Sequence, residues 1–125
     1  PKQPFYISNK DKSTIAIAGI YEEWINPKTA SPITTAAIIT REVAGILKPV
    51  HHRMPVILPK SLWSSWLSNK TLSGDEISDY LKMIDLEKPD AGLTFWPVSD
   101  EVNNARNAGS QLAAQIPLPS SGTLF

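Results

Sequence analysis

Cysteine is absent from this 125-residue sequence. The chain therefore holds no disulfide framework, no zinc site built on thiolates and no cysteine nucleophile of its own. Net charge is absent too, because 12 Lys and Arg residues balance 12 Asp and Glu residues. This balance excludes a globally basic nucleic-acid binder but not a local basic patch. No apolar run approaches the roughly 20 residues that a membrane-spanning helix needs, and no signal peptide opens the sequence.

Proline, by contrast, is abundant, with 11 residues against an average of about 5%. The charge is also unevenly placed. Residues 1–53 carry seven basic and four acidic side chains, for a net charge of +3, whereas residues 54–125 carry five and eight, for −3. A basic first half could meet an anion, although a difference of this size is also common on ordinary protein surfaces.

The first half of the sequence is rich in strand signals. Short β-prone runs occupy residues 5–7 and 54–58, and a turn that would close a hairpin covers residues 9–12. The runs at residues 14–21 and 33–40 are apolar and β-branched, which predicts strands buried within a sheet. We expect residues 24–32 to form a loop and residues 43–47 to form one helical turn.

The second half favours helices. Leu62, Trp63, Trp66 and Leu67 line one helical face after Pro59, and a capping box formed by Ser73 and Glu76 opens a second helix through Ile84. Residues 93–98 predict one further strand. The fold class is therefore α+β, with a curved, mostly antiparallel sheet or open β-barrel flanked by helices.

The strongest chemical signal is the run His51-His52-Arg53-Met54-Pro55. An imidazole can transfer protons near neutral pH, and a guanidinium can hold an anion in its planar fork. In an extended chain, His51 and Arg53 point to one face and His52 to the other. The alternative is two surface histidines beside a structural arginine. A zinc site is disfavoured, because no Cys or nearby carboxylate completes a ligand set.

Three other features have ordinary explanations. The asparagine-rich loop at residues 98–109 offers amide donors for phosphates, or simply caps its own turns. Glu22 and Glu23 suggest acid–base chemistry, but adjacent carboxylates usually point apart in a solvated loop. Trp63 and Trp66 could stack on bases, yet their helical spacing favours core packing.

Taken together, these runs resemble one family in both sequence and order. The segments are Ala18-Gly19-Ile20-Tyr21-Glu22-Glu23-Trp24, Ala37-Ile38-Ile39-Thr40, His51-His52-Arg53-Met54-Pro55-Val56-Ile57-Leu58, Pro97-Val98-Ser99 and Val102-Asn103-Asn104. They are similar to the SOS response-associated peptidase (SRAP) family. Members are about twice as long as this chain, so the resemblance implies that residues 4–116 are the C-terminal part of a single SRAP domain and residues 117–125 a tail.

The resemblance also implies an activity. Family members bind single-stranded DNA, and an N-terminal cysteine exposed by autoproteolysis closes a thiazolidine with the aldehyde of an abasic site. That cysteine and a glutamate would lie in the segment missing here, so this chain alone is expected to be inactive. The implied partners are abasic single-stranded DNA and the missing half, in the bacterial cytoplasm, without cofactor, metal or membrane.

Site residues follow from the same resemblance by position. His51 would be the catalytic histidine. Arg53, Thr40 and His52 would contact DNA, and Ser99 and Asn103 would support the site wall. The alternative is a non-catalytic SRAP-like scaffold or binding domain. The upstream sequence would decide between them.

Overall fold

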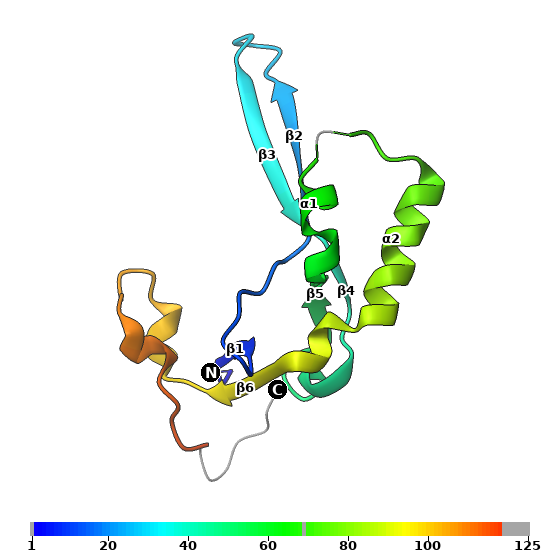
Figure 1. Ribbon diagram of the computed structural model, residues 1–125. Helices are drawn as coiled ribbons and strands as arrows, with labels where there is room; N and C mark the ends of the chain where they lie inside the picture. Colours follow the sequence, from blue (N-terminus) through cyan, green and yellow to red (C-terminus); the bar gives the residue numbers. More distant parts are fainter. Residues whose placement is uncertain (1, 69, 119–125) are drawn as a thin grey trace. The chain divides into compact units, whose positions relative to one another are not determined.

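The computed structural model describes residues 2–68 and 70–118. Within these residues it has six β-strands, two α-helices and five short 3-10 helices (Figure 1). The strands pair as three separate two-stranded antiparallel sheets. The predicted α+β class is confirmed, with three small sheets in place of one curved sheet or open barrel among the described strands.

The chain divides into two compact units, each assembled from separate segments. The first unit takes in Pro1–Thr14, Val43–His52 and Asp90–Phe125, and the second takes in Ile15–Glu42 and Arg53–Pro89. Most of the predicted tail lies outside the described residues, which end at residue 118.

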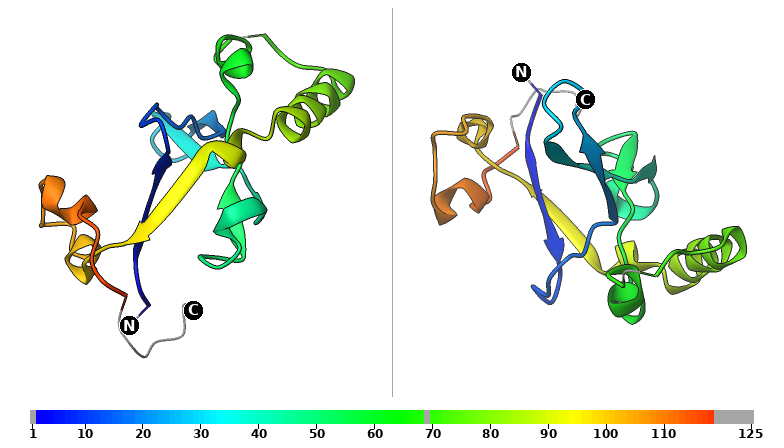
Figure 2. Two further views of the ribbon diagram at one scale, coloured as in Figure 1. Left: turned by 60° about the horizontal axis from the view of Figure 1, so that its bottom comes forward. Right: turned by 90° about the horizontal axis from the view of Figure 1, so that it is seen from above.

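The first unit is built on two strands that are far apart in the sequence, β1 (Phe5–Asn9) and β6 (Leu93–Pro97). They pair antiparallel and lie side by side in both views of Figure 2. Tyr6 stands opposite Trp96, and the centroids of the two rings are 5.1 Å apart. Leu93 is fully buried. Both predicted strands are thereby confirmed.

The turn predicted after β1 is present, but it does not close a hairpin. The Lys12 amide donates to the Asn9 carbonyl at 3.0 Å, and Lys12 has a left-handed φ of 62°. The segment that follows belongs to the second unit, where Ile17 bridges Ile57. Since that segment is engaged elsewhere, β1 pairs with β6 instead of with the next strand.

The second unit contains a hairpin of β2 (Gly19–Ile25) and β3 (Pro32–Ile38). The strands pair along their whole length, and the Ala30 amide donates to the Asn26 carbonyl at 2.8 Å in the connecting turn. Every residue of both strands is exposed. In Figure 1 the hairpin extends away from the helices of the same unit.

The core of the second unit lies between its short strands and its helices. Strands β4 (Thr40–Glu42) and β5 (Arg53–Pro55) pair antiparallel, and α1 (Trp63–Trp66) and α2 (Gly74–Glu87) follow. The main cluster of buried side chains consists of Ala18, Val56, Leu58, Leu62 and Ile84. One helical turn, η2 (Lys60–Leu62), precedes α1 directly after Pro59, as predicted.

Trp63 and Trp66 pack against this core, as the helical spacing predicts. The indole N–H of Trp63 donates to the Leu58 carbonyl at 3.0 Å, and that of Trp66 donates to the Gly19 carbonyl at 3.1 Å. A packed indole needs such a partner for its single polar group. The Trp66 ring therefore ties α1 to strand β2, and the Trp63 ring ties it to the segment just before the helix.

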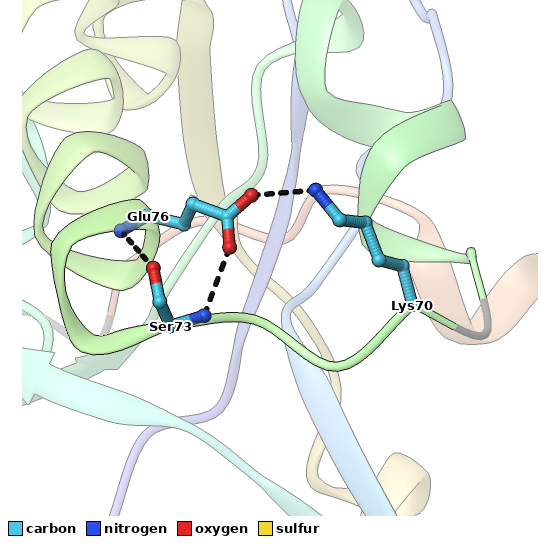
Figure 3. A network of polar contacts seen from close by, with 3 residues as sticks. All are labelled: Lys70, Ser73 and Glu76. Carbon is cyan, nitrogen blue, oxygen red and sulfur yellow. Dashed lines mark hydrogen bonds and ion pairs between the residues drawn. The ribbon is translucent and has the colours of Figure 1, made fainter.

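Helix α2 begins at the predicted capping box (Figure 3). Ser73 Oγ accepts the Glu76 amide at 3.3 Å, and Glu76 Oε2 accepts the Ser73 amide at 2.9 Å. Lys70 Nζ lies 2.7 Å from Glu76 Oε1. The hydrogen bond from Lys70, joined by those from Ser73, lowers the pKa of Glu76 to about 2. The carboxylate also complements the positive end of the helix dipole.

The burial predicted for two strands is wrong. The run at residues 14–21 buries only Ala18 among its members, and the run at residues 33–40 lies mostly in the exposed strand β3. The loop predicted for residues 24–32 is also shorter, because β2 continues to Ile25. Side chains that are apolar on both faces of a strand are the pattern of a buried strand, but no layer of the described residues covers this hairpin.

Candidate functional site

The sheet of β4 and β5 holds the two site residues of the second unit, Thr40 and Arg53. In the antiparallel register Arg53 stands opposite Glu42, and Thr40 stands opposite Pro55. Thr40 and Glu42 are two residues apart and so share one face of their strand. The Arg53 side chain can therefore reach Thr40 diagonally across the sheet.

Arg53 makes that contact with two hydrogen bonds. Its Nη2 donates to Thr40 Oγ1 at 2.6 Å and to the Thr40 carbonyl at 2.9 Å. The neighbouring Met54 is buried, with 4% of its surface exposed, and anchors the strand beneath an exposed guanidinium. A guanidinium has five N–H donors in a rigid fork, so the Thr40 bonds fix the plane in which the fork lies.

His51 and His52 form a pair in the first unit. Their rings are stacked, with centroids 4.3 Å apart and planes inclined by 27°. The backbone that carries them is held by two hydrogen bonds, from the His51 amide to the Leu47 carbonyl at 3.2 Å and from the Val43 amide to the His52 carbonyl at 3.1 Å. Both side chains are exposed.

The stacking changes the expected alternation of faces. The strand begins only at Arg53, and His52 lies in a bend. The condition for alternation, an extended chain from His51 onwards, is therefore not met, and His52 lies beside His51 rather than opposite to it. Because His51 and Arg53 belong to different units, their sharing of one site stays a prediction.

Ser99 and Asn103 lie after β6 in the first unit. Ser99 precedes the 3-10 helix η4 (Asp100–Asn103), and its Oγ accepts the Glu101 amide at 3.3 Å. Two further asparagines cap the same loop, because Asn104 Oδ1 accepts the Arg106 amide and Asn107 Nδ2 donates to the Glu101 carbonyl. The ordinary explanation, a self-capped loop, thus describes these bonds, and the supporting role of Ser99 and Asn103 stays a prediction.

The paired glutamates do not form a carboxylate site. Glu22 and Glu23 are adjacent in β2 and stand opposite Thr35 and Thr34 in the hairpin, so they lie on opposite faces. Among residues 2–68 and 70–118, no group of three or more His, Cys, Asp and Glu side chains could hold a metal ion. No helix in this part of the chain is long and apolar enough to span a membrane.

The exposed aromatic side chains of the hairpin were not predicted from the sequence. Tyr21 is 74% exposed and Trp24 is 50% exposed, although the first was assigned to a buried strand and the second to a loop. The available signal was the pair Trp24 and Ile25, two strand-forming residues that extend β2 past its two glutamates.

The chain is similar in sequence to a known protein family and to several of its members. The family profile described as SOS response associated peptidase (SRAP) matches residues 1–105. The abasic site processing protein YoaM of Bacillus subtilis is 34% identical over 111 residues, which are 89% of this chain and 47% of YoaM. The abasic site processing protein HMCES of Pongo abelii is 34% identical over 105 residues, 83% of this chain and 28% of HMCES.

A solved structure supports the fold. The crystal structure of a protein from Bacteroides thetaiotaomicron matches with a TM-score of 0.70 and 24% identity, and the match covers 92% of this chain and 49% of that protein. The chain thus spans about half the length of this protein and of YoaM, and less of HMCES.

Proposed function

Because the chain belongs to the SOS response associated peptidase family, we propose that it is the C-terminal part of a protein that binds single-stranded DNA and crosslinks to abasic sites. Its relatives YoaM and HMCES are named as abasic site processing proteins. The nucleophile, an N-terminal cysteine freed by autoproteolysis, lies in the part of the domain that this chain lacks. Such a protein acts in the cytoplasm, on damaged DNA.

The proposed reaction joins that cysteine to the open-chain aldehyde of an abasic site. The cysteine amine condenses with the aldehyde and releases water, and the thiol then adds to the resulting C=N bond to close a thiazolidine. His51 moves protons during the opening of the sugar ring. Its imidazole suits this step, because an imidazole exchanges protons near neutral pH. His52, stacked on His51 with centroids 4.3 Å apart, contacts the DNA beside it.

Arg53 and Thr40 are proposed to hold the DNA backbone. The observation that carries this role is the pair of hydrogen bonds from Arg53 Nη2 to Thr40, at 2.6 and 2.9 Å. A guanidinium fixed in one plane can meet a phosphate in the two-pronged geometry that arginine favours. Ser99 and Asn103 support the wall of the site through the loop after β6.

The test uses a hybrid protein, namely YoaM in which the segment matched by this chain is replaced by this chain. The hybrid and the chain alone are each incubated with abasic single-stranded DNA and run on a denaturing gel. The hybrid should give a stable covalent band, and the chain alone should give none, because it has no thiol. A band from the chain alone would refute the assignment of the nucleophile.

The role of His51 has its own test in the hybrid. His51→Ala should slow formation and reversal of the crosslink by about 10²–10⁴-fold, the usual contribution of one positioned acid–base group. His51→Ala with unchanged rates would exclude that role. A hybrid that binds abasic DNA without ever forming a crosslink would favour the alternative, a non-catalytic scaffold.

A further inference from the structure

The hairpin of β2 and β3 exposes more large apolar side chains than any other pair of strands described here. Its exposed members are Ile20 (59%), Tyr21 (74%), Trp24 (50%), Ile25 (54%), Ile33 (44%) and Ile38 (64%). Single exposed apolar residues are ordinary on protein surfaces, whereas contiguous ones mark an interaction site. Here they stand on two paired strands, and each lies opposite an apolar or small residue of the other strand.

The register divides these side chains between both faces of the hairpin. Ile20, Trp24 and Ile33 share one face, where Trp24 stands opposite Ile33. Tyr21, Ile25 and Ile38 share the other face. Each face carries a single Glu–Thr pair between its apolar positions. A hairpin with one solvated face alternates apolar and polar residues, so this pattern is that of a strand pair covered on both sides.

The comparisons identify what is missing around it. The chain aligns with 49% of a solved protein at a TM-score of 0.70, and with 47% of YoaM. About half of such a domain therefore lies outside this chain. A second copy of the chain is a poorer occupant, because a two-fold dimer buries the same patch on both partners. Such a dimer would cover one face of each hairpin and leave the other face in water.

We propose that the half of the domain absent from this chain covers both faces of the β2–β3 hairpin, so that the hairpin becomes interior to the complete domain. The inference rests on one part of the proposed function, namely that the complete protein contains a whole SRAP domain. It does not depend on whether the protein binds DNA. The hairpin is thus an assembly surface, distinct from the Arg53–Thr40 pair assigned to DNA.

The absence of cysteine from this chain provides the test. An introduced cysteine is the only thiol of the chain, and mass spectrometry of its peptide separates it from thiols elsewhere in the hybrid. Tyr21→Cys reports on one face and Ile33→Cys on the other. Lys28→Cys, in the exposed turn between the strands, is the matched control. Each variant is treated with a maleimide, both in the chain alone and in the hybrid.

In the chain alone, all three thiols should react at similar rates. In the hybrid, the thiols at positions 21 and 33 should react more slowly by about tenfold or more, because labelling of a covered site requires local opening. The control at position 28 should stay within about twofold. Unprotected thiols on either face of a folded hybrid would overturn the inference, and so would protection in a dimer of the chain alone.

Failure of the inference and failure of the proposed function are distinguishable. A hybrid that protects both faces but neither binds nor crosslinks abasic DNA supports the assembly surface and refutes the DNA function. A hybrid that crosslinks DNA while its hairpin remains fully reactive refutes the assembly surface alone.

Discussion

The hydroxyl of Thr40 offers the sharpest test of the proposed contact between Arg53 and DNA. Thr40→Val keeps a β-branched side chain of similar shape in β4, and it leaves the bond from Arg53 Nη2 to the Thr40 carbonyl at 2.9 Å in place. It removes only the acceptor Oγ1, which lies 2.6 Å from Nη2. The variant therefore loosens the guanidinium without deleting its charge.

The size of the effect follows from the exposure of the pair. A hydrogen bond to a charged group contributes about 1.5–3 kcal/mol when it is well shielded, but exposed charged pairs typically contribute about 0.2–1 kcal/mol. Both Thr40 and Arg53 are exposed, so the lower range applies. Since about 1.4 kcal/mol is a factor of ten, we expect DNA binding to weaken by roughly 1.4- to fivefold.

The assay is fluorescence anisotropy of the hybrid with single-stranded DNA that carries a non-reactive abasic analogue, over a series of salt concentrations. Thr40→Val should weaken binding at every salt concentration and leave the salt slope unchanged, since no charge is lost. Arg53→Ala should weaken binding further and reduce the slope by about 0.7, as expected for one phosphate contact on a single strand.

A control substitution makes the result decisive. Thr71→Val changes an exposed threonine ahead of α2 and should leave affinity unaltered. Equal affinities for Thr40→Val and Thr71→Val would show that the Thr40 hydroxyl does not orient Arg53 toward DNA. An unchanged salt slope in Arg53→Ala would remove the phosphate contact from the proposed function.

Three further predictions concern stability. Ser73→Ala removes the acceptor of the Glu76 amide. Because a helix cap typically contributes about 1 kcal/mol, hydrogen exchange of amides in the first turn of α2 should accelerate about fivefold. An exchange rate equal to that of the wild type would contradict this prediction. The pKa of Glu76 is lowered to about 2 from 4.5. The stability that the ionised Glu76 carboxylate gives the protein is therefore complete above pH 4.5 and is lost as the pH falls toward 2. An NMR titration of the Glu76 carboxyl carbon with a midpoint near 4.5 would refute the capping network. Leu93→Ala should destabilise the hybrid by about 2–5 kcal/mol in urea unfolding, because the side chain is fully buried, and a cost below about 1 kcal/mol would show that the β1–β6 sheet is not packed there.

Local signals predicted local structure well. The Ser73 capping box, the run from Ile77 to Ile84 and the strand at residues 93–97 all depend on neighbours within a few residues, and each was confirmed. Pairing partners depend on the rest of the chain. The turn after β1 looks like a hairpin turn, yet β1 pairs with a strand more than 80 residues away, because the next segment enters another unit.

Burial was predicted poorly for a different reason. The run at residues 14–21 was expected to form a buried strand, whereas the observed strand is Gly19–Ile25 and its residues are exposed. A local apolar pattern does not identify the residues that would cover a strand. For the candidate site, the family resemblance assigned both Thr40 and Arg53 to contacts with DNA, and their strands do pair. The stacking of His51 on His52 was not predictable, because it depends on the bend at His52, which strand periodicity does not encode.

The interleaving of the two units along the chain sets an order for folding during synthesis. Once residue 89 has left the ribosome, every segment of the second unit is available, whereas the first unit still lacks β6. Strand β1 must wait for β6, which lies more than 80 residues later in the chain, and contacts between such distant segments are slow to form. Until β6 has been synthesised, the unpaired backbone of β1 is exposed to incorrect pairing with other segments. A nascent chain paused just after Pro89 should therefore protect α2 from hydrogen exchange while β1 exchanges freely.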